Sequence, residues 1–184
     1  MKQLLITLTM AALLHATIVR SAEPVAKSPQ GEDAVKATYL VTGLHCPPCT
    51  KTVETSLQRV EGIRSIKVDW KTKSALIEFD EAVLPAQRIA QLIAATPHMM
   101  GGTMHYAGWL LLTTPGIKDE ATGKQAQEAL AGIEGVKQVV AYPAQHSVGV
   151  QFAPKGELTT RQLVDKLKEA GFEVEAPANA AKHK

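Results

Sequence analysis

The spacing of apolar side chains changes in a regular order along the first half of the chain. Residues 37–42 form a short β-rich run, and residues 47–59 place apolar side chains at helical spacing. Residues 63–69 and 75–79 alternate apolar and polar positions around a polar turn, and residues 85–95 return to helical spacing. The pattern predicts strand, helix, two paired strands and helix. The helical faces are set by Val53, Leu57, Val60, Ile89, Leu92 and Ile93.

The same order returns about 73 residues further along the chain, as an internal repeat. The segment 60–63, Val-Glu-Gly-Ile, corresponds to 133–136, Ile-Glu-Gly-Val, and Phe79 corresponds to Phe152. Apolar periodicity, charge and glycine therefore agree between the copies. The second copy predicts strands near 109–113, 136–142 and 147–152, helices near 119–132 and 160–170, and a short last strand at 172–175.

Each copy has the order β-α-β-β-α-β, which predicts an α+β fold of two ferredoxin-like domains. In such a domain two helices cover one face of a four-stranded antiparallel sheet. The expected domains are residues 36–106 and 107–176. The last strand of the first copy and the first strand of the second must both lie between Met99 and Thr114. We expect them to run together through 106–112 and to tie the domains closely.

The first residues are typical of a secretory signal peptide. Lys2 supplies a positive charge, Leu4–Leu14 is almost wholly apolar, and Ser21 and Ala22 are small residues at the expected cleavage site. An uncleaved membrane anchor is the alternative, but the apolar run is shorter than the roughly 20 residues that span a bilayer. We expect a signal peptide at 1–22 and export, to the periplasm or beyond.

The segments that flank the two predicted domains, and the overall composition, limit the functions that are possible. Residues 23–35 and 177–184 are polar or small, and we expect a flexible leader and a loose tail. The net charge is only +2 and aromatic residues are 4%, which argues against nucleic-acid binding. The chain shows no Ser-His-Asp set, paired carboxylates or phosphate loop, so we expect no enzyme.

The two cysteines of the chain lie in the sequence Gly-Leu-His-Cys-Pro-Pro-Cys, 43–49, between the first predicted strand and helix. A helix N-terminus favours thiolate over thiol, and thiolates select soft ions such as Cu(I) and, by the same logic, Hg(II). Zn(II) prefers four ligands, and there is no second cysteine pair. In an oxidising compartment Cys46 and Cys49 could instead form a disulfide, whose small ring adds little stability.

With this element order, the motif resembles that of the heavy-metal-associated domain family, over roughly residues 36–175. That family includes copper chaperones, the N-terminal domains of copper-transporting ATPases and the periplasmic mercury-binding protein. The resemblance implies Cys46 and Cys49 as metal ligands, Cu(I) as the favoured ion with Hg(II) as another, and a metal-transporting membrane protein or metallochaperone as partner. The second copy carries Asp119 and Thr122 at the cysteine positions, so we expect it to bind no soft metal.

The first copy departs from the family pattern near the motif. Leu44 replaces the usual methionine, His45 replaces the threonine before the first cysteine, and prolines fill the two middle positions. His98 stands where the family often has a tyrosine or phenylalanine that lies beside the metal loop. His98 and His45 are therefore candidate further ligands, or else surface side chains. Nearby residues with the same potential are Met99, Met100, Met104 and His105.

Two other functions remain open at this point. Cys-Pro-Pro-Cys also occurs in thioredoxin-like reductases, which predicts a thiol–disulfide oxidoreductase of the cell envelope. Those proteins usually have tryptophan before the first cysteine and a different element order, whereas His45 occupies that position here. The other function is a module that docks on a membrane transporter or an envelope protein, with no role for metal.

Overall fold

The computed structural model describes residues 34–175. The predicted signal peptide, the tail and nearly all of the predicted leader lie outside the described residues. Within them, no helix is long and apolar enough to cross a bilayer.

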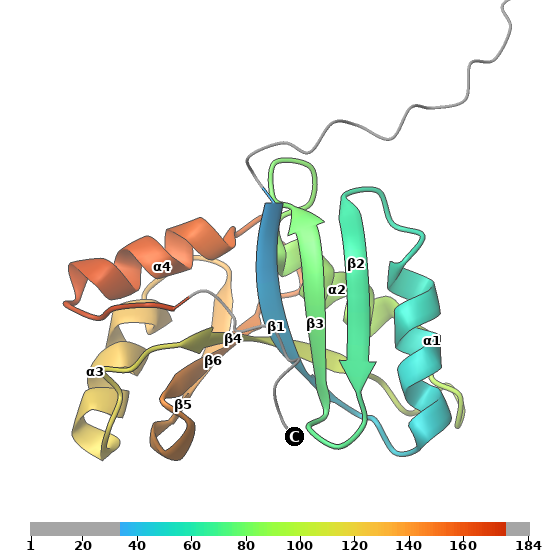
Figure 1. The fold of residues 1–184 in the computed structure, drawn as a ribbon, viewed down its shortest axis with the longest axis horizontal. Helices are drawn as coiled ribbons and strands as arrows, with labels where there is room; N and C mark the ends of the chain where they lie inside the picture. The colour runs from blue at the N-terminus through green and yellow to red at the C-terminus, as the bar shows by residue number, and fades with distance from the viewer. Residues whose placement is uncertain (1–33, 176–184) are drawn as a thin grey trace, which may run out of the picture.

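The described chain forms the predicted succession of helices and strands (Figure 1). The first strand begins at residue 34, three residues before the expected start, and the bounds of the other elements named here lie within two residues of their expected positions. The elements are β1 (Ala34–Thr42), α1 (Pro47–Leu57), β2 (Ile63–Asp69), β3 (Ser74–Asp80), α2 (Ala86–Ala95), β4 (Ala107–Thr113), α3 (Glu120–Ala131), β5 (Val136–Tyr142), the 3-10 turn η1 (Pro143–Gln145), β6 (Ser147–Phe152) and α4 (Thr160–Glu169).

The strands form one six-stranded antiparallel sheet in the order β2-β3-β1-β4-β6-β5. The fold is α+β and ferredoxin-like, but the two expected four-stranded sheets are one six-stranded sheet, with a single strand where the last strand of the first copy and the first strand of the second were expected to run together. Strand β4 pairs with β1 along one edge and with β6 along the other. Only one strand fits into the short stretch before α3, so β4 closes the first half of the sheet and opens the second.

The short last strand expected at 172–175 is also corrected, because the structure shows a single bridge there. Glu175 pairs with Thr113 alone, and its N–H donates to the Thr113 carbonyl oxygen at 2.9 Å. The edge of β4 that a longer strand would need is already paired with β1 as far as Leu111. Backbone groups on one strand edge cannot serve two partners, so only the end of β4 is left.

The main core lies between the sheet and its helices. Leu110 pairs with Val150 and Leu112 with Val148, and all four side chains are buried on one face. Gly108 belongs to the same face, and a Cβ there would meet Ile93 and Ala90 of α2. The glycine thus allows α2 to approach the shared strand closely. Figure 1 shows α1 beside β2 at one end of the sheet and α3 beside β5 at the other, with α4 next to α3, and α2 packs chiefly on β4.

A fully buried glutamine, Gln87, joins the beginning of α2 to the loop after β6. Its side-chain nitrogen donates to the carbonyl oxygens of Ala153 and Lys155, both at 2.9 Å. Its side-chain oxygen accepts the Leu158 N–H at 3.0 Å, and its own backbone N–H donates to the Leu158 carbonyl oxygen at 2.9 Å. Close by, the Glu81 carboxylate accepts N–H groups at the beginning of α4. These bonds fix the second half of the chain against α2.

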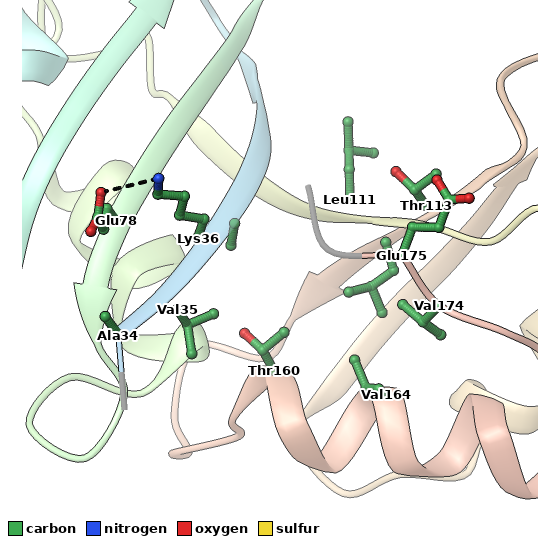
Figure 2. Close-up of a pocket in the computed structure, with 12 residues that line it drawn as sticks. Ala34, Val35, Lys36, Glu78, Leu111, Thr113, Thr160, Val164, Val174 and Glu175 are labelled. Carbon is green, nitrogen blue, oxygen red and sulfur yellow. Dashed lines mark ion pairs between the residues drawn. The ribbon is translucent and has the colours of Figure 1, made fainter. Parts of the chain in front are cut away.

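A cavity of about 460 Å³ opens where the N-terminal part of β1 diverges from the end of β4 (Figure 2). Its lining is mostly apolar and includes Val35, Leu111 and Val164, with the Lys36–Glu78 ion pair at its border. The cavity is lined by the opposite end of β1 from the cysteine loop, and its lining within residues 34–175 contains no histidine or cysteine. It is therefore separate from the candidate metal site.

Replacing Gln87 with leucine is expected to lower the free energy of unfolding by about 2–4 kcal/mol, because buried carbonyl and N–H groups lose their partner. The measurement is urea unfolding of the full chain. The control is Gln91→Leu, one turn further along α2, whose bond to the Gly156 carbonyl oxygen is exposed. The control should change stability by less than about 0.5 kcal/mol. Equal losses in the two variants would contradict the role assigned to Gln87.

Candidate metal centre

The cysteine loop leaves β1 through a left-handed glycine and enters α1 through two prolines. Gly43 has φ of +86°, and a Cβ there would overlap the carbonyl oxygen of His105. Leu44, next to this glycine, is buried in the core. The segment before β4 and the cysteine loop are thus in backbone contact, which only glycine allows at this position.

Cys46 is the N-cap of α1, with extended backbone and no side-chain capping hydrogen bond. The next two residues, Pro47 and Pro48, have no N–H, and the Cys49 N–H donates to the Cys46 carbonyl oxygen at 3.0 Å. The free N–H donors that a helix N-terminus normally offers to a thiolate are therefore largely absent. What remains is the partial positive charge of the helix end.

Cys46 and Cys49 are joined by a disulfide, with 5.4 Å between their Cα atoms. Cys49 is completely buried against the core, whereas Cys46 is half-buried. Reduction would leave two thiols on one helical turn, one of them open to solvent. Within residues 34–175, no group of three or more His, Cys, Asp and Glu side chains is placed to hold a metal ion. Sulfur is a soft ligand, of the kind that suits soft ions.

Lys73 is a neighbour of the loop that sequence analysis missed. Its ammonium group donates to the Leu44 carbonyl oxygen at 2.9 Å and lies over the Trp70 ring, 2.9 Å from the ring centroid. Its φ is +54°, so the turn between β2 and β3 aims it back at the loop. This bond ties the turn between β2 and β3 to the backbone of the cysteine loop. In the sequence Lys73 is simply one polar residue of a predicted turn, which gives no hint of this contact.

His98 lies beside the loop, as its place in the alignment with the family suggests. Its Nδ1 accepts the Met100 N–H at 3.1 Å, so its Nε2 carries the proton and donates to the Gly43 carbonyl oxygen at 2.9 Å. The ring stacks on Tyr106, with centroids 4.5 Å apart. Both nitrogens are therefore engaged with backbone groups, and the ring holds the loop against the segment before β4.

Tyr106 forms the floor of this histidine stack. The residue is buried, and within the described part of the chain its hydroxyl lacks a hydrogen-bond partner of good geometry. Burial raises the pKa of Tyr106, and the nearby Met99 backbone offsets part of that rise. The phenol is thus held neutral, as an apolar support for the ring above it.

His45 is exposed at the rim of the loop. Its ring meets the His98 ring edge to face, with centroids 5.7 Å apart. Among the described residues, the structure gives its nitrogens no hydrogen bond, unlike those of His98. The structure thus brings together Cys46, Cys49, His45 and His98 at one end of the sheet, and of the two histidines it is His45 whose imidazole nitrogens are free.

The corresponding loop of the second half carries a cap in place of cysteines. Asp119 is the N-cap of α3, and its carboxylate accepts the Thr122 N–H at 2.8 Å, while the Asp119 N–H donates to the Thr122 hydroxyl at 3.2 Å. The Thr122 N–H, and the Thr122 hydroxyl that donates to the carboxylate at 2.7 Å, lower the pKa of Asp119. The helix end is satisfied by its own side chains, which is the ordinary structural solution.

Comparison with known proteins gives the class to which this fold and this loop belong. The heavy-metal-associated domain profile matches residues 38–98. The copper chaperone CopZ of Enterococcus hirae is 34% identical over 59 residues, which are 32% of this chain and 86% of CopZ. The chain therefore belongs to the heavy-metal-associated domain family. The match contains both cysteines and ends before β4.

Two further relatives extend the comparison. The periplasmic component of the mercuric transport protein of Serratia marcescens is 32% identical over 54 residues, 29% of this chain and 59% of that protein. The solution structure of the N-terminal soluble domains of Bacillus subtilis CopA has a TM-score of 0.38 at 20% identity, covering 81% of this chain and 97% of that one.

Replacing Gly43 with alanine is expected to lower the free energy of unfolding by about 3 kcal/mol or more, because left-handed strain is joined by overlap with the His105 carbonyl. Gly101→Ala is the matched control, since Gly101 also has positive φ but a Cβ there would meet no described atom within 4 Å. The control should lose about 1 kcal/mol, from strain alone. Chemical denaturation measures both, and equal losses would refute the close contact.

Asp119→Ala is expected to lower the melting temperature most at neutral pH. The lowered pKa means that the ionised carboxylate stabilises the fold above its ordinary pKa of 3.8, and that this stabilisation is lost as pH falls through the folded-state pKa. The difference in melting temperature between wild type and the Asp119→Ala variant should therefore become smaller in acid. Thermal scans from pH 7 to pH 2 measure it, with the exposed Asp165→Ala as control. A difference in melting temperature that grows in acid would contradict a stabilising role for the ionised Asp119 carboxylate.

Proposed function

We propose that this protein binds one soft metal ion, Cu(I) by preference or Hg(II), through the reduced thiolates of Cys46 and Cys49, and passes it on by ligand exchange. The observation that carries the proposal is the position of the two cysteines. They occupy one turn, at the strand-to-helix loop of a heavy-metal-associated domain. Relatives named for copper and for mercuric transport support these ions. No enzymatic activity is proposed.

The different exposure of the two cysteines suits transfer. Cys49 is buried and anchored in the core, whereas Cys46 faces solvent in part. An incoming thiolate from a partner would reach the ion from the side of Cys46, forming a sulfur–metal bond as the Cys46 bond breaks. His98 would keep the loop in place through its bond to Gly43. Two-ligand coordination leaves the open position that such exchange needs.

The wider biological setting is part of the proposal. Residues 1–22 would act as a signal peptide, placing the mature chain in the periplasm or another exported location. Residues 36–106 would form the metal-binding domain, and 107–176 a related domain without metal that docks on the partner. The partner would be a metal-transporting membrane protein or a metallochaperone, as the names of relatives suggest.

The disulfide supports one competing function. A Cys-Pro-Pro-Cys pair that is oxidised in the structure is also suited to thiol–disulfide exchange. In that case the pair would reduce or oxidise a partner's cysteines, and metal binding would be incidental. A metal titration of the reduced chain separates the two functions.

The test is anaerobic titration of the reduced full chain with Cu(I), and separately with Hg(II), against a chelator of known affinity. Wild type should bind one ion tightly. Cys46→Ser with Cys49→Ser should weaken binding by more than about 100-fold, because loss of a supporting group alone costs about 10–100-fold. The matched control is Asp119→Ser with Thr122→Ser, which changes the corresponding loop and should bind like wild type.

Two results would count against the proposal. Equal affinity in the cysteine variant and wild type would remove the thiolates from the site. Weak binding by both, together with reduction of a disulfide substrate by wild type alone, would favour the oxidoreductase.

A further inference from the structure

Two methionines lie where a turn normally carries polar residues. The Gly101 N–H donates to the His98 carbonyl oxygen at 3.3 Å, which makes Met99 and Met100 the central residues of a turn. Their side chains are 57% and 61% exposed, and Val83 is the one other large hydrophobic side chain exposed to this degree in residues 34–175. Methionine ordinarily fills gaps in a core, and turns favour Gly, Pro, Asn, Asp and Ser. Packing therefore does not explain these side chains.

The methionine turn is held against the cysteine loop. The His98 ring joins them, because its Nδ1 accepts the Met100 N–H and its Nε2 donates to the Gly43 carbonyl oxygen. The same ring also meets the ring of His45. The methionine turn and the free imidazole of His45 therefore both adjoin the His98 ring, next to the cysteine loop.

We propose that Met99, Met100 and His45 form a second subsite for a soft monovalent ion, distinct from the thiolate pair. Thioether sulfur and imidazole nitrogen are neutral ligands that suit Cu(I). They need no deprotonation of a thiol, and they remain available when Cys46 and Cys49 are joined. The subsite therefore holds the ion in the oxidised state, in which the thiolate site is closed. The choice of ion rests on the proposed function, since the subsite serves the same cargo.

His98 is excluded as a ligand of this subsite by its own contacts. Binding a metal through either nitrogen would break a bond to Gly43 or to Met100. Its role is to position the methionine turn. Met104 is not part of the proposed subsite, because it lies outside the methionine turn and is less exposed than Met99 and Met100. It therefore serves as an internal reference.

The test uses the oxidised full chain, with its disulfide intact, and Ag(I) as the probe in nitrate buffer without chloride. Ag(I) shares the ligand preferences of Cu(I) and does not donate an electron to a disulfide. With ¹³C-labelled methionine methyl groups, one equivalent of Ag(I) should shift the Met99 and Met100 signals and leave Met104 unchanged. Met99→Leu with Met100→Leu should weaken binding at least tenfold, as should His45→Phe, whereas Met104→Leu should not. Leucine preserves side-chain volume, so folding should be kept.

The outcomes separate the subsite from the proposed function. Absence of Ag(I) binding by the oxidised chain, or shifts confined to other methionines, would overturn the subsite, and tight Cu(I) binding by the reduced chain would still support the thiolate site. Retained Ag(I) binding by the oxidised chain, with no cysteine-dependent Cu(I) binding on reduction, would uphold the subsite and remove the proposed function.

Discussion

The structure depends on the double pairing of β4. Residues 107–111 of this strand pair with β1, and residues 109–113 pair with β6, so the backbone groups on both edges are used. One strand therefore belongs to both halves, and the halves cannot part without breaking a ladder of backbone hydrogen bonds in the middle of the sheet. The buried Gln87 adds a second connection on the helical side. The cysteine loop is in this way built on a scaffold wider than one domain of its family.

In each half of the chain, a side chain from the turn between paired strands holds the loop before a helix, but the side chain differs. Lys73 and His146 both have positive φ, of +54° and +48°, at the turn between paired strands. Lys73 donates to the carbonyl oxygen of Leu44, and the His146 ring bonds the carbonyl oxygen of Ile117 at 2.8 Å. Each bond ties that turn to the loop before a helix. The backbone arrangement is thus kept, while the helix N-cap differs: Cys46 makes no capping bond, and Asp119 makes a full capping box.

The different N-cap residues of α1 and α3 distinguish a residue that stabilises its helix from one that does not. An Asp or Thr at a helix N-terminus satisfies orphan N–H groups, so its gain appears in folding. Cysteine at the same place gives up that gain. Cys46 occupies the N-cap position of α1 without capping it, so capping does not explain a cysteine there, whereas the reactivity of sulfur does. The second half of the chain supplies the comparison, because it keeps the loop and replaces the sulfur with a cap.

The elements could be predicted from sequence because each depends on local periodicity and turn residues. The sequence places the shared strand at 106–112, one residue from β4, but not its two partners, since which edge pairs with which strand is decided by contacts distant in sequence. Nothing in the residues 172–175 shows that β1 already occupies the edge they would need. At the site, the cysteines were identifiable from the motif and His98 from its alignment. The engagement of both His98 nitrogens, and the contact of Lys73, depend on side-chain directions that the pattern does not contain.

The prolines between the cysteines have a physical consequence for the sulfur atoms. Pro47 and Pro48 remove two N–H groups that would otherwise bond to a thiolate, and the Cys49 N–H is directed to the Cys46 carbonyl oxygen. A sulfur anion that accepts fewer hydrogen bonds keeps more of its electron density for a metal ion or another sulfur. Lys73 supplies positive charge through its bond to the loop backbone at Leu44. The loop therefore combines a backbone stiffened by two prolines with a cysteine pair whose sulfurs, once reduced, would accept few hydrogen bonds.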